Sequence, residues 1–159
     1  MRPSESVTVL VAALLVSGCG AEYVDPPPET PVRLQTPACT GNTPPPPMRV
    51  PADFTPVEAL VCGEKLVGSP RQRPGPYLYT RYRGDFADAL TGFARRDRKR
   101  NPNCQASVIA LPELWLIDQT GGGFIPRYPM DECGTDNIKA LNEILALTVV
   151  ERERRPFPG

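Results

Sequence analysis

Apolar and polar positions follow a strand pattern in two stretches near the middle of the chain. Residues 57–62 mix β-branched and apolar side chains over the length of a strand, which predicts a half-buried strand. Residues 77–83 alternate imperfectly and predict a second strand, after a loop of breaker residues at 68–76. The alternation places one set of side chains on each face of the second strand: Tyr77, Tyr79 and Arg81 on one, Leu78, Thr80 and Tyr82 on the other.

Two further stretches carry apolar residues at helical spacing. Asp85 is a good N-cap for the first, which should end near residues 98–100, before Asn101-Pro102-Asn103. Gly92 inside this helix costs up to about 1 kcal/mol against alanine and indicates close packing. Asp136 is expected to cap the last helix. The apolar stripes are Phe86, Ala89, Leu90, Phe93 and Ala94 in the first helix, and Ile138, Leu141, Ile144, Leu145 and Thr148 in the last.

A second β region lies between the two helices. Residues 107–111 and 114–117 are short apolar runs, residues 118–123 form a glycine-rich loop, and residues 124–127 return as a hairpin arm at a sheet edge. The expected fold is a small single α+β domain over residues 48–150 in the order β-β-α-β-β-α. Residues 151–159, charged and interrupted by proline, are expected to form a disordered tail.

Proline and polar residues dominate the region ahead of this domain. Residues 20–47 lack the apolar periodicity of a core and favour extended polyproline II. At about 3.1 Å per residue such a segment extends to roughly 85 Å. We therefore expect residues 19–47 to be a disordered tether.

The first apolar run, residues 7–16, is too short to cross a hydrocarbon core of about 30 Å as a helix. It leads into Leu15-Val16-Ser17-Gly18-Cys19, which resembles the lipobox of bacterial lipoproteins. The resemblance implies a signal peptide over residues 1–18 and acyl chains such as palmitate on Cys19, hence attachment to the extracytoplasmic face of the cell membrane. A buried N-terminal helix is the alternative.

Four cysteines remain after Cys19, an even set that in an exported chain predicts two disulfides. Four cysteines allow three pairings, and their number does not choose between them. Cys104 and Cys133 bracket the predicted hairpin, so we pair them, which leaves Cys39 with Cys62. A metal site is disfavoured because the chain has no C-x-x-C motif and no histidine.

Charge and composition exclude several function classes. The chain has 18 basic and 18 acidic residues, so nucleic-acid binding has little electrostatic support. Without histidine there is no Ser-His-Asp or Cys-His site. Gly121-Gly122-Gly123 lacks the Lys-Ser or Lys-Thr of a phosphate loop, and no cofactor is expected. Carboxylate pairs remain an alternative, although exposed loop acids explain them: Glu113, Asp118, Asp131, Glu132 and Asp136.

Basic residues outnumber acidic ones between positions 71 and 100, where three tyrosines also lie. Arginine and tyrosine are enriched where binding energy concentrates, and cations are attracted to anionic headgroups or wall polymers. A solvated helix end and ordinary sheet packing are the alternatives. The candidate partner-binding residues are Arg81, Arg83, Arg95, Arg96 and Arg98.

Two resemblances extend these inferences. Phe54-Thr55-Pro56-Val57, Cys62, Cys104, residues 112–118 and Pro129-Met130-Asp131-Glu132-Cys133-Gly134 are similar to small actinobacterial lipoproteins of unknown function. More faintly, the order Gly84-Asp85-Phe86, Leu90, Cys104, Pro112, a glycine hairpin and Cys133 resembles subtilisin-inhibitor-like proteins. That resemblance implies a reactive bond near Ala106-Ser107, although the spacing from Cys104 to Pro112 is longer than in that family and the chain ends in a predicted helix.

The sequence thus predicts a membrane-anchored extracytoplasmic lipoprotein that acts as a non-catalytic binding or structural module of the cell envelope. Its partner is expected to be an envelope protein or a wall polymer. A tethered protease inhibitor is the alternative, and a hydrolase using a carboxylate pair comes third.

Overall fold

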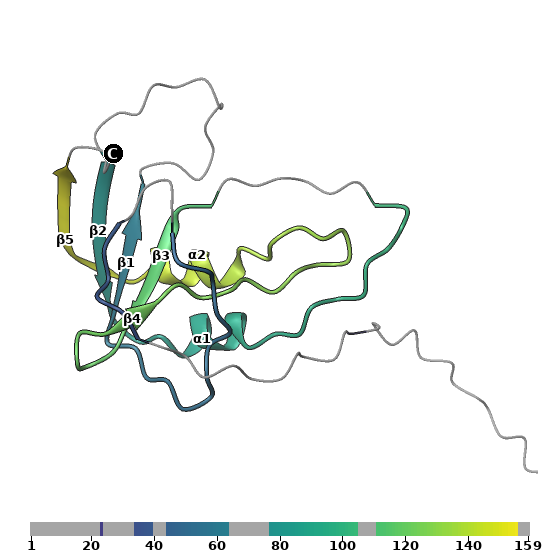
Figure 1. Cartoon of the computed structure of the whole chain (residues 1–159), viewed down its shortest axis with the longest axis horizontal. Coiled ribbons are helices and arrows are strands. Elements are labelled where there is room, and N and C mark those ends of the chain that lie inside the picture. The colour runs from purple at the N-terminus through teal and green to yellow at the C-terminus, as the bar shows by residue number, and fades with distance from the viewer. Residues whose placement is uncertain (1–22, 24–33, 40–43, 64–76, 105–110, 156–159) are drawn as a thin grey trace, which may run out of the picture.

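The computed structural model describes residues 23, 34–39, 44–63, 77–104 and 111–155. These residues form one five-stranded antiparallel sheet in the order β4-β3-β1-β2-β5, together with two short helices (Figure 1). No described helix is long and apolar enough to cross a membrane. In chain order the elements are β1 (Glu58–Cys62), β2 (Tyr77–Arg83), α1 (Ala87–Phe93), β3 (Glu113–Ile117), β4 (Gly123–Phe124), α2 (Lys139–Leu145) and β5 (Thr148–Arg155).

The larger core lies between the helices and one face of the sheet. Alternate residues of β1 and β3 face the helices because successive side chains of a strand point to opposite faces. Both helices contribute small as well as large residues to this core, and Gly92 of α1 lies directly against Ala140 of α2. The buried members are Ala59, Val61, Tyr82, Phe86, Ala89, Phe93, Leu114, Leu116, Tyr128, Ala140, Leu141 and Ile144.

A smaller core lies on the opposite face, over β1 and β3. Leu60, Cys62, Trp115 and Ile117 are buried there, and Cys39 covers them from the N-terminal side. The central strands β1 and β3 are therefore buried on both faces. This accounts for β1, in which all five residues are buried rather than every second one.

Residues 34–39 are attached to the sheet, which corrects the expectation of a disordered tether over this segment. Gln35 and Gly123 exchange two backbone hydrogen bonds of 2.8 and 2.9 Å, and Met48 N–H donates to the Ile125 carbonyl at 2.8 Å. The disulfide between Cys39 and Cys62 fixes the same segment to β1. Proline content indicated an extended backbone but not its docking on the sheet.

The predicted disordered tail is also corrected, because β5 occupies residues 148–155 and pairs with the whole of β2. All eight residues of β5 are exposed. Without a buried face the strand has no apolar alternation, which is the pattern that identifies a strand from sequence. A fifth strand therefore follows the second helix, where the sequence analysis placed the tail.

Both helices are shorter than predicted. The N-cap of α1 is Phe86 rather than the predicted Asp85, which accepts a hydrogen bond from Ala87 N–H at 2.9 Å just ahead of the helix. The helix ends at Phe93. Beyond it the backbone turns to the segment before α2, where Arg98 N–H donates to the Met130 carbonyl at 2.9 Å. At the start of α2, Asn137 rather than Asp136 accepts from the backbone, from Lys139 N–H at 3.1 Å.

Several predictions are confirmed. The chain forms a small single domain with two helices and an antiparallel sheet, and strands lie at 58–62, 77–83 and 113–117. Both predicted disulfides are present, Cys39–Cys62 and Cys104–Cys133. The strand expected at 107–111 lies, except for Leu111, outside the described residues.

Candidate functional site

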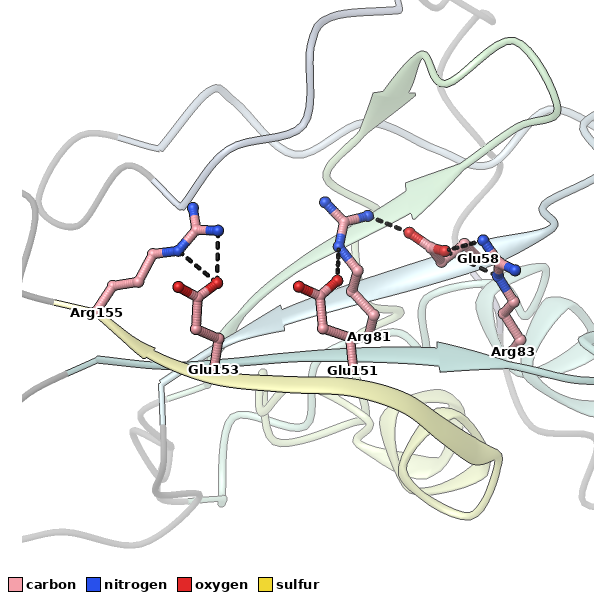
Figure 2. Close-up of polar contacts among 6 residues, drawn as sticks. All are labelled: Glu58, Arg81, Arg83, Glu151, Glu153 and Arg155. Atoms are coloured by element: carbon pink, nitrogen blue, oxygen red, sulfur yellow. Dashed lines mark hydrogen bonds and ion pairs between the residues drawn. The ribbon is translucent and has the colours of Figure 1, made fainter.

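Six charged residues lie in a row on the sheet face opposite the helices, across β1, β2 and β5, as a connected group of four and a separate Glu153–Arg155 pair (Figure 2). We call this row the charged ladder. Cross-strand pairing places its members together, because Arg81 lies opposite both Leu60 of β1 and Glu151 of β5. Residues directly opposite on neighbouring strands point to the same face. The ladder consists of Glu58, Arg81, Arg83, Glu151, Glu153 and Arg155.

Glu58 is the buried centre of the ladder, with 6% of its surface exposed. One carboxylate oxygen accepts from an Nη of Arg81. The other accepts from Nε of Arg83 at 2.9 Å and lies 2.8 Å from its Nη2. A buried carboxylate is costly unless it is paired and hydrogen-bonded, and here two guanidinium groups meet both conditions.

The ladder continues outward to the edge of the sheet. Arg81 also contacts Glu151, with Nε 3.2 Å from Oε2, so it bridges a buried and an exposed glutamate. At the far end Arg155 donates to Glu153 from two nitrogens, at 2.8 and 2.6 Å, which lowers the pKa of the Glu153 carboxyl. The Arg155 guanidinium also lies 5.1 Å from the centroid of the Tyr79 ring, within the range of a cation–π contact.

This geometry holds several arginines in place while leaving them accessible. The side chains of Arg83 and Arg155 are 63% and 54% exposed. Their guanidinium groups are already oriented by the glutamates and by Tyr79, so a partner would order them at little further entropic cost. The arrangement suits binding to a surface with charges of both signs.

The structure divides the predicted arginine surface into two groups. Arg81 and Arg83 belong to the charged ladder. Arg95, Arg96 and Arg98 instead follow α1, which packs on the other face of the sheet, and Arg98 Nη1 lies 3.1 Å from Glu132 Oε2. The three tyrosines also separate: Tyr79 lies under Arg155, Tyr82 is buried facing the helices, and the side chain of Tyr77 is not described.

The carboxylates considered for acid–base chemistry have structural partners. Asp118 accepts from Thr120 N–H and Oγ1 and from Gly122 N–H, and the hydrogen bond from the Thr120 hydroxyl is the main cause of the lowered pKa of its carboxyl. Asp131 accepts from Cys133 and Thr135 N–H, both at 2.9 Å. Each of these two carboxylates therefore stabilises a turn, whereas Glu113, expected to be an exposed loop acid, is partly buried at the start of β3.

Two other acidic candidates are also held by neighbours. Glu113 accepts from Trp115 Nε1 at 2.7 Å, and Glu132 forms the ion pair with Arg98. Asp136 lies close enough to the buried Tyr128 for its charge to add to the effect of burial, which is the larger cause of the raised pKa of that phenol.

Gly121 and Gly122 lie in the hairpin turn between β3 and β4, as the interpretation as a hairpin turn predicted, and Gly123 begins β4. Gly121 adopts a φ of 81°, a left-handed conformation that glycine tolerates best. An added Cβ at Gly123 would lie 2.6 Å from the Leu116 carbonyl oxygen, so this strand pairing requires glycine.

Some predicted sites cannot be placed. Cys19, Ala106 and Ser107 lie outside the described residues. Within the described ranges, no group of three His, Cys, Asp or Glu side chains is arranged to hold a metal ion. No protein-family model, curated protein or solved structure matches this chain.

Sequence reasoning identified the arginines of β2 but missed the four other members of the ladder: Glu58, Glu151, Glu153 and Arg155. A usable signal was present in residues 151–155, where charge alternates in sign at the period of a strand before the final arginine. Glu58 gave no such signal, since it stands in an otherwise apolar run.

Proposed function

We propose that this chain is a lipoprotein anchored through Cys19 to the extracytoplasmic face of the cell membrane, where it acts as a non-catalytic module that binds another envelope protein. The lipobox supports the anchor. The two disulfides fit an oxidising compartment. The lack of histidine removes catalysis by a histidine general acid or base.

The charged ladder is the observation that carries the binding role. Over β1 and β3 this sheet face is covered by a small core that includes Cys39 of the N-terminal segment, whereas the ladder presents ordered arginines to solvent. Arginine and tyrosine are the residues on which interface energy concentrates, and a standard interface needs only about 800 Å² per partner. A domain of this size has room for such a surface beside its core.

The first test concerns the anchor. Cys19→Ala removes the thiol that would carry the lipid, so the protein should leave the membrane fraction or remain unprocessed. Fractionation of cells that express the wild-type chain or the variant measures this. An unmodified Cys19 in the intact mass of the mature wild-type protein would contradict the proposal.

The second test concerns the binding surface. Arg83→Ala with Arg155→Ala removes two exposed guanidinium groups while Arg81 still pairs with the buried Glu58. Crosslinked capture of the partner on intact cells should fall by about tenfold or more, because a hot-spot arginine contributes over about 1 kcal/mol.

Arg95→Ala with Arg96→Ala is the matched control, since both residues are exposed and follow α1. This control should leave capture unchanged, and thermal melts should show that both double variants are folded. If capture is lost only in the control, the binding surface is the segment after α1 and not the ladder.

A further inference from the structure

One edge of the sheet is open in the part of the chain that the structure describes. β4, at the opposite edge, has two residues, and Gln35 bridges to it. β5 has eight residues, all exposed, and no described segment pairs with its outer side. Such an edge presents a row of backbone donors and acceptors that can pair with a further strand.

The charges of β5 are sorted between its two faces. Glu151, Glu153 and Arg155 lie on the ladder face, opposite Arg81, Tyr79 and Tyr77 of β2. Arg152 and Arg154 lie on the other face, opposite Thr80 and Leu78. The side chains of Glu151 and Glu153 remain 53% and 45% exposed, so a second cation can approach each carboxylate.

This sorting opposes pairing between two copies of the chain when the symmetry axis passes through the charged part of β5, residues 151–154. In an antiparallel pair related by a two-fold axis, each residue lies opposite one from the same face of the other copy. If the axis passes at residue 152, 153 or 154, arginine faces arginine. If it passes at residue 151, Glu151 faces its own copy. Like charges directly opposite destabilise a sheet.

We propose that the outer edge of β5 accepts one antiparallel strand of an envelope protein whose acidic residues face Arg152 and Arg154 and whose basic residues face Glu151 and Glu153. The partner strand therefore alternates acidic and basic residues over at least four positions. This inference rests on the proposed binding role and names the chemistry of the partner. Val149 and Val150, 42% and 47% exposed, extend the same edge with apolar surface.

A synthetic peptide with the core Val-Glu-Lys-Glu-Lys-Val tests the charge pattern on the purified full chain, by titration calorimetry. Its charges complement β5 in the antiparallel register. A peptide of identical composition in block order, Val-Glu-Glu-Lys-Lys-Val, should bind about tenfold more weakly, since it cannot match both faces. Equal affinities for the two peptides would overturn the proposal.

Two N-methylated forms of the alternating peptide test the backbone pairing. One carries methyl groups on the glutamate nitrogens and the other on the lysine nitrogens. Only alternate residues of a strand direct their N–H toward one neighbour, so one peptide should lose binding and the other should keep it. Equal behaviour of the two peptides would overturn edge pairing, because attraction between charges alone does not distinguish them.

The variant Arg152→Glu tests whether the peptide binds at the outer edge of β5. The variant should bind the alternating peptide about tenfold more weakly, and a peptide with its second glutamate changed to lysine should restore the affinity. Lys139→Glu, at an exposed basic residue outside the candidate binding residues, is the matched control and should change nothing. Equal loss in both variants, or a dimer in sedimentation that Arg152→Glu dissociates, would overturn the proposal. These measurements require neither the lipid nor the ladder arginines Arg83 and Arg155, so they fail independently of the tests of the proposed function.

Discussion

Asp97 connects the segment that follows α1 with the loop that precedes α2. Its carboxylate accepts from Arg127 Nη2 at 2.5 Å and from Met130 N–H at 2.9 Å, and its side chain is 19% exposed. Burial alone would raise the pKa of Asp97, but these hydrogen bonds and the charges of Arg127 and Arg49 outweigh burial and lower the pKa below its ordinary value. The ionised form therefore stabilises the folded state.

The sign of the resulting pH dependence follows from linkage. A group with a lowered folded-state pKa contributes its full stability above the unfolded pKa, about 3.9, and loses it as the pH falls through the folded value. Asp97→Asn should lower the free energy of unfolding by roughly 1–3 kcal/mol at neutral pH. It should also make the acid loss of stability shallower. Urea unfolding at a series of pH values measures both effects.

The control for this change is Asp53→Asn at an exposed aspartate, which should leave the stability at neutral pH nearly unchanged. Plots of unfolding free energy against pH for Asp97→Asn and wild type could instead stay parallel below about pH 4. That result would show that Asp97 binds protons equally in the folded and unfolded states.

At the scale of elements, the contact between the two helices depends on one glycine. An added Cβ at Gly92 would lie 2.8 Å from Ala140 Cβ and 3.0 Å from its Cα. Gly92→Ala gains up to about 1 kcal/mol in helix propensity. Overpacking typically costs about 1–3 kcal/mol, so the net effect should be destabilising by roughly 1–2 kcal/mol in denaturant unfolding.

Ala140→Gly provides the matched second variant, because it removes the methyl group that the new Cβ would meet. The double variant should be more stable than the sum of the two single changes predicts, since contacting residues couple. Additive effects would mean that the helices separate freely and that the close approach at Gly92 does not determine stability.

The elements also show where sequence reasoning succeeds and where it fails. β1, β2 and β3 were predictable because each has a local apolar pattern and at least one buried face. β5 was not, because its stabilising contacts come from β2, more than sixty positions earlier in the sequence, and none of its residues is buried. The end of α1 failed for a related reason: hydrogen bonds to the segment around Met130 override local helix propensity.

The candidate site was likewise predictable only in part. Arginine density pointed to Arg81 and Arg83 but grouped them with Arg95, Arg96 and Arg98, which the fold places elsewhere. These residues are close in sequence but separate in the fold, because the β2 arginines lie on the sheet face opposite the helices and the others follow α1 on the helix side. The ladder instead joins residues from three strands. Cross-strand register, which local sequence does not specify for an exposed strand, is what brings Glu58, Arg81 and Glu151 together.

At the scale of the whole molecule, the two disulfides join segments that lie 23 and 29 positions apart in the sequence. Cys104–Cys133 links the segments around Asn101 and Glu132, which also share a backbone hydrogen bond of 2.7 Å. Cys39–Cys62 holds the N-terminal segment over the smaller core. Both pairings were predictable because few cysteines were available and the hairpin order favoured one solution.

Removing Cys39–Cys62 should therefore release a segment as well as lower stability. The bridge spans 23 residues, and loop closure of this length contributes about 3–4 kcal/mol on the chain-entropy model. In Cys39→Ala with Cys62→Ala, the amide protons of Gln35 and Gly123, which donate to each other's carbonyls, should exchange with solvent well before the Leu60 amide of the central strand.

The control variant is Cys104→Ala with Cys133→Ala, which opens a comparable 29-residue link. It should lower global stability by a similar amount but keep the Gln35 and Gly123 amides as protected as the rest of the sheet. Native-state hydrogen exchange separates the two outcomes. If Gln35 and Gly123 exchange together with Leu60 in both variants, the segment is held by its hydrogen bonds and core contacts and not by the disulfide.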